Sequence, residues 1–292
     1  MQTSQTITAR SASNLAGAFI LLPKKKRLAM CALYAFCREV DDVADEEESP
    51  AAERRARLQA WREDVRVACG AGSPRFPVNR ELQPVILAHK LPFNLFDELI
   101  KGVEMDLDIQ RYETLEQLEQ YCYRVASVVG LLSIEIFGYQ DAGCQEYARH
   151  LGKALQLTNI LRDVRTDAAK GRIYLPLQEL QRFGVSPEEI LRSQYSPRYL
   201  AAARSIAAVA REYYVKARQA LPAVDRRSMT TAELMGSVYW RLLEKLERNE
   251  FNVFHTPETR LTKPQKVFLI FRTWFRIWSG GLVPNYGLVR KC

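Results

Sequence analysis

The chain has 292 residues, of which 47% are hydrophobic and 26% charged, an ordinary composition for a soluble globular protein. No uncharged apolar run reaches the roughly 18 residues that a membrane-spanning helix needs, so no such helix is expected. The net charge of +8 suits a polyanionic substrate or a membrane surface, whereas dispersed basic residues without zinc-finger spacing or a basic-region heptad argue against nucleic acid.

Helical periodicity extends through nearly the whole chain, and no segment alternates apolar and polar residues as a half-buried strand does. Proline and glycine mark most of the expected helix ends. We predict an all-α fold: a single-domain bundle of many helices around a central cavity, spanning residues 1–292 with disorder in about the first ten. The expected helices cover residues 11–22, 24–47, 51–68, 78–89, 92–109, 114–137, 145–167, 177–183, 187–193, 197–221, 232–254 and 264–278.

The cysteines and the amino-terminal sequence indicate a reducing compartment. Several cysteines lie in apolar helical stretches, as small buried hydrophobes do, and none forms a C-x-x-C pair. The six are Cys31, Cys37, Cys69, Cys122, Cys144 and Cys292. Residues 1–10 lack the basic-then-apolar pattern of a secretory signal. A cytoplasmic location is expected, with peripheral membrane contact left open.

Two segments carry oxygen-bearing side chains at four-residue spacing. Asp41 and Asp45 form a pair, and Asn159, Asp163 and Asp167 form an i, i+4, i+8 ladder. On a helix each set lies on one face, one turn apart, where like charges repel unless a cation lies between them. Hard oxygen ligands without His or Cys favour Mg²⁺ completed by phosphate oxygens and water. A solvated acidic face is the alternative, and two such ladders favour a metal–diphosphate site.

Such a site would support a particular chemistry. Mg²⁺ would make a diphosphate a good leaving group, and an allylic carbocation would survive where water is excluded and aromatic faces surround it. Ordinary core packing is the alternative role for each aromatic residue. The aromatic candidates are Tyr34, Phe36, Tyr121, Tyr123 and Tyr239.

Three segments resemble the signature motifs of the squalene/phytoene synthase family: residues 32–46, 121–130, and 155–164 followed by 171–176. They occur in the order found in that family, and the similarity extends over roughly residues 11–275. The resemblance implies the isoprenoid synthase fold. It also implies head-to-head condensation of two isoprenyl diphosphates through a cyclopropylcarbinyl diphosphate.

The resemblance also implies roles for individual residues. The metal ligands for Mg²⁺, or for Mn²⁺ in its place, would be Asp41, Asp45, Asn159, Asp163 and Asp167. Tyr34, Arg38, Arg172 and Tyr174 would contact the diphosphates, joined by Arg260 or Lys263, and the predicted substrate-binding set also includes Arg162 and Tyr239. Tyr121 would lie beside the reacting carbons, steady the cation and assist proton loss, and the four aspartates would complete the catalytic set.

The chain departs from the family pattern in two places. The family usually has Ser-Phe near its first helix, where this chain has Asn14, Leu15 and Ala16, a change that bears on pocket shape and chain-length preference. The second signature usually has an acidic residue before its last aspartate, where this chain has Thr166. That change lowers the negative charge beside the metal ligands without removing one, so activity is still expected.

Segments 102–107, 125–130 and 136–141 resemble the bacterial presqualene diphosphate synthases of the squalene and hopanoid pathway. These condense two farnesyl diphosphates and stop at the cyclopropane, so no NADPH is expected. Phytoene synthase, which uses two geranylgeranyl diphosphates, is the close alternative, and a complete NADPH-dependent squalene synthase ranks lower. No G-x-G-x-x-G motif is present, which is weak evidence against a nicotinamide site.

Two further classes remain. A chain-elongating prenyltransferase would carry Asp-Asp-x-x-Asp in its second motif, whereas here Val164 follows Asp163. A non-enzymatic membrane-surface helical protein is suggested by residues 266–278, which mix five aromatic residues with Arg272 and Arg276. The alternative for that segment is a terminal helix that packs on its own bundle with its basic residues outward.

Overall fold

The chain folds into helices joined by short connections, as predicted. The computed structural model describes residues 1–10, 18–46, 48–70, 72–254, 259, 261–278 and 286–287, without the side chains of residues 20, 263, 266, 267, 274 and 276–278. Within this part the β pairing is a single isolated bridge between Arg111 and Ile173. The α-helices are α1 (Gln2–Arg10), α3 (Lys24–Asp45), α4 (Ala51–Cys69), α5 (Pro77–His89), α6 (Phe93–Asp108), α7 (Leu115–Cys122), α8 (Val128–Phe137), α9 (Gly143–Ala169), α10 (Leu177–Arg182), α11 (Pro187–Leu191), α12 (Pro197–Ala220), α13 (Thr230–Arg248) and α14 (Lys263–Trp278).

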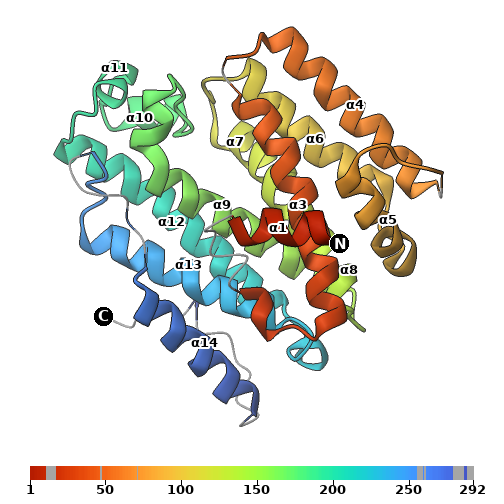
Figure 1. Ribbon diagram of the computed structural model, residues 1–292. Helices are drawn as coiled ribbons and strands as arrows, with labels where there is room; N and C mark the ends of the chain where they lie inside the picture. Colours follow the sequence, from red (N-terminus) through yellow and green to blue (C-terminus); the bar gives the residue numbers. More distant parts are fainter. Residues whose placement is uncertain are drawn as a thin grey trace.

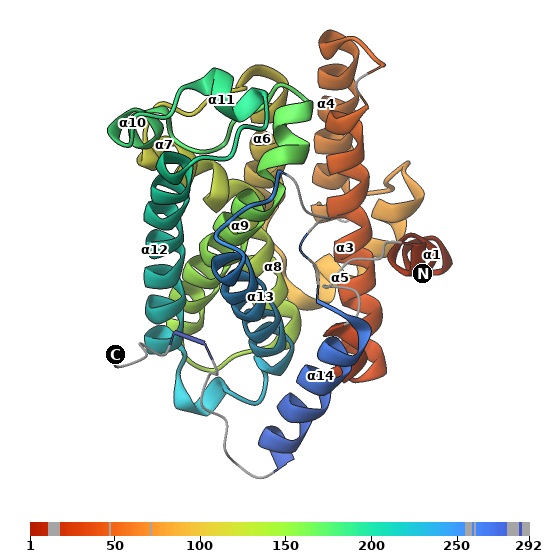
Figure 2. The same cartoon turned by 90° about the vertical axis from the view of Figure 1, so that its left-hand side faces the viewer.

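The helices form two groups that face each other (Figures 1 and 2). Helices α3, α4, α5 and α6 pack on one another on one side, and α9, α12 and α13 on the other, with α8 contacting both α3 and α9. Helix α14 packs on α13 at one end of the bundle. A large hydrophobic cluster includes residues from α3 through α13. Among the described residues, no helix is long and apolar enough to cross a membrane.

Helix α9 approaches the preceding helical segment closely because each of the two carries a glycine at the contact. A Cβ atom on Gly152 would lie 2.5 Å from the Cα atom of Ser127, and one on Gly130 would lie 3.0 Å from the carbonyl oxygen of Ala148. The hydroxyl of Ser127 donates to the carbonyl of Arg149 at 2.7 Å. Helix α9, which carries the second predicted motif, is therefore held close to the segment that follows Tyr121.

The structure differs from the sequence-based boundaries in three places. The first residues form α1. The backbone N–H groups of Thr3 and Ser4 donate to the Glu81 carboxylate at 3.0 and 2.9 Å, so Glu81, which is distant in the chain, caps the start of this helix. The helix expected over residues 114–137 contains a π-helical turn, η2 (Tyr123–Ser127), between α7 and α8. Helix α13 ends at Arg248, where Glu250 and Phe251 have positive φ. Most of the helix expected over residues 11–22 lies outside the described residues, which show a 3₁₀ turn, η1 (Phe19–Leu21).

Candidate functional site

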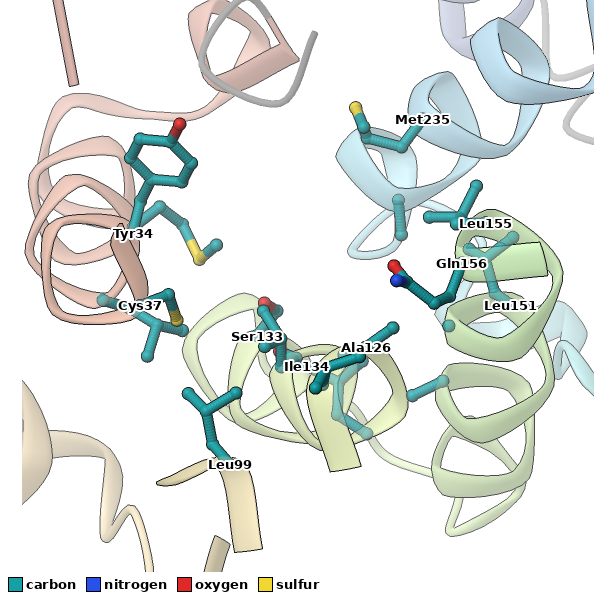
Figure 3. A pocket seen from close by; sticks show the side chains of 18 of the residues that line it. Tyr34, Cys37, Leu99, Ala126, Ser133, Ile134, Leu151, Leu155, Gln156 and Met235 are labelled. Atoms are coloured by element: carbon teal, nitrogen blue, oxygen red, sulfur yellow. The ribbon is translucent and has the colours of Figure 1, made fainter. Parts of the chain in front are cut away.

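A cavity of about 430 Å³ opens between α3, α6, the η2–α8 segment, α9 and α13. Its wall is mainly apolar. Figure 3 shows Tyr34 and Cys37 of α3 across the open space from Leu155 of α9 and Met235 of α13. This is the central cavity that the sequence predicted.

Six of the predicted site residues line the cavity: Tyr34, Arg38, Asp41, Tyr121, Asn159 and Tyr239. Six others are not part of its wall and lie in the adjoining helix turns and the loop after α9: Asp45, Arg162, Asp163, Asp167, Arg172 and Tyr174. Arg260 lies outside the described residues, as does the side chain of Lys263, although Lys263 begins α14.

One row of α9 side chains at four-residue spacing carries both the polar and the apolar part of the site. The four-residue spacing of the predicted ladder continues toward the start of the helix, where the side chains become apolar. In chain order this stripe consists of Tyr147, Leu151, Leu155, Asn159, Asp163 and Asp167. Its first four members line the cavity. The same helix therefore presents an apolar wall and, at one end of it, oxygen ligands.

Basic side chains already neutralise part of the acidic set. Arg172 and Lys170 lie 3.4 and 3.5 Å from the carboxylate of Asp45. The guanidinium of Arg162 donates to both oxygens of its neighbour Asp163, at 2.7 and 2.5 Å. Arg172 thus connects the loop after α9 to the end of α3, and brings the two predicted motifs together.

Two carboxylates at this end carry displaced pKa values. Partial burial at the cavity rim and then the charge of Asp45 raise the pKa of Asp41 to about 6. Burial and then the charge of Asp163 raise the pKa of Asp167 to about 7, against the opposing effect of Arg172. Burial and repulsion between neighbouring aspartates both disfavour the charged carboxylates, and a cation bound at this end would oppose both effects.

The donor set fits a divalent cation shared with a phosphate ligand. The side-chain oxygen of Asn159 is buried and has no hydrogen-bond partner, so it is available as a ligand. Within the described part of the chain, no group of three or more His, Cys, Asp or Glu is arranged to hold a metal ion by itself. Mg²⁺ is commonly held by only one or two protein oxygens, with water and substrate phosphates completing its octahedron. Asp41, Asp45, Asn159, Asp163 and Asp167 supply oxygens of this kind.

A third carboxylate connects Tyr121 to the loop after α9. Asp106 of α6 accepts hydrogen bonds from the hydroxyls of Tyr121 at 3.0 Å and Tyr174 at 2.7 Å. The rings of Tyr121 and Tyr174 lie 5.2 Å apart, and Tyr112 is within 5.5 and 5.7 Å of them. Burial raises the pKa of Asp106, and its charge in turn contributes to the raised pKa values of Asp41 and Asp167. Asp106 therefore lies within electrostatic reach of both acidic motifs.

Sequence reasoning did not assign a role to Asp106. The available signal was its position on the amphipathic helix: it follows the buried Leu99 and Val103 at seven- and three-residue spacing, so it occupies the apolar face. A carboxylate on such a face needs polar partners. Those partners are distant in the chain, which is why the helix pattern alone did not identify them.

The loop after α9 reaches this position through backbone geometry. Gly171 adopts a positive φ of 72°, which ends the helix, and the Arg172 N–H donates to the carbonyl of Asp167 at 2.9 Å. The Ile173 N–H then donates to the carbonyl of Gln110 at 2.9 Å, beside the end of α6. Arg172 and Tyr174 are thereby fixed on either side of Ile173, next to the acidic end of the cavity.

Comparison with known proteins agrees with this geometry. The squalene/phytoene synthase family model matches residues 8–265. A presqualene diphosphate synthase of Rhodopseudomonas palustris is 36% identical over 269 residues, covering 89% of this chain and 92% of the relative. A 15-cis-phytoene synthase of Synechocystis is 32% identical over 282 residues, covering 92% and 83%.

The fold is also found among solved structures. A dehydrosqualene synthase crystallised with a ligand superposes with a TM-score of 0.84 at 28% identity, covering 95% of this chain and 99% of that one. The shared motifs, the all-α fold and the matched length lead to one conclusion. The chain belongs to the squalene/phytoene synthase family of prenyl-transferring enzymes.

Proposed function

We propose that the protein condenses two farnesyl diphosphates head to head, in the 1′-1 sense, to presqualene diphosphate with release of diphosphate. The observation that carries this proposal is one apolar cavity with an oxygen-rich end, where Tyr121, Asp41 and Asn159 converge. An apolar pocket suits two prenyl chains, and the acidic end suits their diphosphates through metal ions. The presqualene diphosphate synthase of Rhodopseudomonas palustris, at 36% identity, supports this choice of product.

In this proposal the polar residues bind and the apolar residues exclude water. Asp41, Asp45, Asn159, Asp163 and Asp167 would hold Mg²⁺, or Mn²⁺ in its place, which supplies the charge that makes diphosphate a good leaving group. Arg38 and Arg172 would bind phosphate oxygens directly. The Tyr34 and Tyr239 side chains, on opposite helices of the cavity wall, would contact the substrates.

Tyr121 is proposed to act on the carbocation. Its side chain is 5% exposed and lines the cavity, so its ring is available to a cation in a water-poor space. Burial, first, and the charge of Asp106, second, raise the pKa of Tyr121 well above its usual value, so the hydroxyl stays protonated and donates to Asp106. Asp106 would thus orient the ring rather than contact the substrate.

A direct test is incubation of the purified protein with Mg²⁺ and labelled farnesyl or geranylgeranyl diphosphate, followed by product identification by mass spectrometry. We expect presqualene diphosphate from farnesyl diphosphate, and loss of turnover when the metal is chelated. Phytoene formation from geranylgeranyl diphosphate alone would instead favour the second candidate, phytoene synthase, which relatives 32–36% identical to this chain support.

We further propose a cytoplasmic enzyme that contacts an anionic membrane surface through α14. Phe268, Phe271 and Phe275 of α14 are 63%, 65% and 57% exposed and lie on one helix face, while Leu269 is buried toward α13. The helix sequence contains four basic residues and no acidic one. This arrangement differs from a terminal helix with only basic residues outward, and is typical of interfacial helices.

Flotation with anionic phospholipid vesicles tests the membrane contact. Replacing Phe268 and Phe271 by Ser should release the protein from the vesicles. The matched control replaces Leu87 and Val224, which are similarly exposed at 50% and 56% but lie elsewhere, and should leave flotation unchanged. Equal flotation of both double variants would contradict a docking role for α14.

A further inference from the structure

The cavity has a polar end and an apolar end, and its lining residues give its direction. On α3 the lining extends from Asp41 back to Met30, and on α9 from Asn159 back to Tyr147. At 1.5 Å per residue, both stretches are about 17 Å long. On the η2–α8 side the lining ends at Phe137. Tyr147 therefore lies at the apolar end of the cavity, far from the acidic motifs.

Tyr147 is fixed there by a partly buried carboxylate. Its hydroxyl donates to Oε1 of Glu233, in the first turn of α13, at 2.7 Å. The hydroxyl of Tyr286, from the carboxyl-terminal segment, donates to the same oxygen. Both tyrosine side chains are completely buried. Two phenols from segments far apart in the chain thus converge on one oxygen behind the cavity wall.

Glycines make room for Tyr286 behind this wall. A Cβ atom on Gly236 would overlap the Tyr286 ring, and Gly236 directly follows Met235, which lines the cavity. Gly287 has a φ of 66°, and a Cβ atom there would lie 2.9 Å from the carbonyl oxygen of Tyr214. Tyr286 itself is not part of the cavity lining. It supports the wall from outside.

We propose that Tyr147, held by Glu233 and backed by Tyr286, is the floor of the cavity and limits the length of the prenyl chain that it accepts. The substrate class in this inference rests on the proposed function. An added isoprene unit is comparable in length to one helical turn of about 5 Å, so a floor at a fixed position discriminates between successive chain lengths. Hydrogen bonding and packing keep the Tyr147 ring in place. An aliphatic side chain without a hydrogen bond could instead rotate out of the way.

The test measures binding separately from turnover. Unreactive analogues of geranyl, farnesyl and geranylgeranyl diphosphate, with sulfur in place of the bridging oxygen, would be titrated calorimetrically into the full chain with Mg²⁺. In the native protein, we expect affinity to increase from geranyl to farnesyl and to fall by about tenfold or more for geranylgeranyl. Tyr147→Ala should abolish this loss of affinity for the geranylgeranyl analogue, because removing the ring deepens the cavity. Tyr286→Ala should reduce the loss, because Tyr286 acts only through Tyr147.

The matched control is Leu151→Ala, one turn closer to the polar end on the same face of α9. This substitution widens the cavity and leaves Tyr147 in place, so the affinity should still fall for the geranylgeranyl diphosphate analogue. Ala232 lines the cavity near the apolar end, and Ala232→Leu should shift the binding preference toward the geranyl diphosphate analogue. This substitution keeps the hydrogen bonds of Tyr147 and Tyr286 to Glu233. Thermal melting monitors folding of every variant.

Two results would overturn the inference: an unchanged length profile in a folded Tyr147→Ala protein, or an unchanged profile in Ala232→Leu. A protein that shows the expected profile but forms no presqualene diphosphate would contradict the proposed function and leave the floor in place. The two hypotheses are therefore separable by this experiment.

Discussion

The hydroxyl of Tyr121 donates to the Asp106 carboxylate at 3.0 Å, and this bond connects the residue proposed to face the carbocation with a carboxylate that also accepts from Tyr174. Both tyrosines and Asp106 are largely withdrawn from solvent, so the hydrogen bonds are stronger than they would be in water. The orientation of the Tyr121 ring is thus set by a residue whose charge also acts on Asp41 and Asp167, one in each acidic motif.

Asp106→Asn should lower kcat by about 10- to 100-fold with little change in KM, because an amide offers only one accepting oxygen to two phenols and the Tyr121 ring loses its fixed orientation. Steady-state kinetics with farnesyl diphosphate measure this. Asp108→Asn, on the same helix but exposed and paired with Arg55, is the control and should be nearly neutral. Equal effects of the two substitutions would exclude a positioning role for Asp106.

Tyr121→Phe and Tyr121→Ala should separate the hydroxyl from the ring. Phe keeps the aromatic face and loses the bond to Asp106, so we expect about a tenfold loss of kcat with substrate affinity largely kept. Ala also removes the face, which should lower the rate by about another 30-fold, equivalent to roughly 2 kcal/mol of cation–π stabilisation. Equal losses would assign the effect to the hydroxyl alone, and no loss in either would leave Tyr121 a packing residue.

Asp45→Ala and Asp163→Ala should each reduce turnover by about three orders of magnitude while the helical content stays native, because each removes a proposed metal ligand from a partly exposed position. Chelation of Mg²⁺ should have the same effect on the native protein. Glu46→Ala is the control, because Glu46 follows Asp45 directly but pairs with Arg57. Near-normal activity of either aspartate variant at saturating Mg²⁺ would refute the metal–diphosphate mechanism.

Gly152→Ala should destabilise the protein by about 1–3 kcal/mol, because the new Cβ atom would lie 2.5 Å from the Cα atom of Ser127 and would force α9 away from η2. Chemical denaturation measures the free energy of unfolding. Gly70→Ala is the control, since its Cβ atom would make only ordinary contacts at 3.6 Å and the residue has a negative φ. A neutral Gly152→Ala would mean that the contact relaxes without penalty.

The sequence predicted what depends on local periodicity. The i, i+4 spacing of Asn159 and Asp163 placed them correctly on one helix face, and proline and glycine marked most helix ends within a few residues. What it missed depends on partners far apart in the chain. Asp106 meets Tyr174 across 68 residues and Glu233 meets Tyr286 across 53, and no local pattern encodes such contacts. The helix at residues 2–10 was missed for the same reason, because its anchor is Glu81.

The last prediction concerns where the reaction stops. With farnesyl diphosphate and Mg²⁺ we expect presqualene diphosphate to accumulate, and addition of NADPH should not convert it efficiently to squalene. The second ionisation must be coupled to hydride delivery, and the sequence has no recognisable motif for holding a nicotinamide donor. Product analysis with and without NADPH measures this directly.

Each alternative outcome of that experiment leads to a different assignment. Rapid NADPH-dependent formation of squalene would make the protein a complete squalene synthase. Turnover only with geranylgeranyl diphosphate would make it a phytoene synthase, and would direct attention to two features. One is the departure from the family pattern at Leu15 and Ala16, which lie outside the described residues, and the other is the Tyr147 floor of the cavity. Tyr147→Ala truncates the floor and Leu151→Ala truncates the wall one turn away on α9, so their product ratios would show whether depth at the floor or width along the wall decides between the two products.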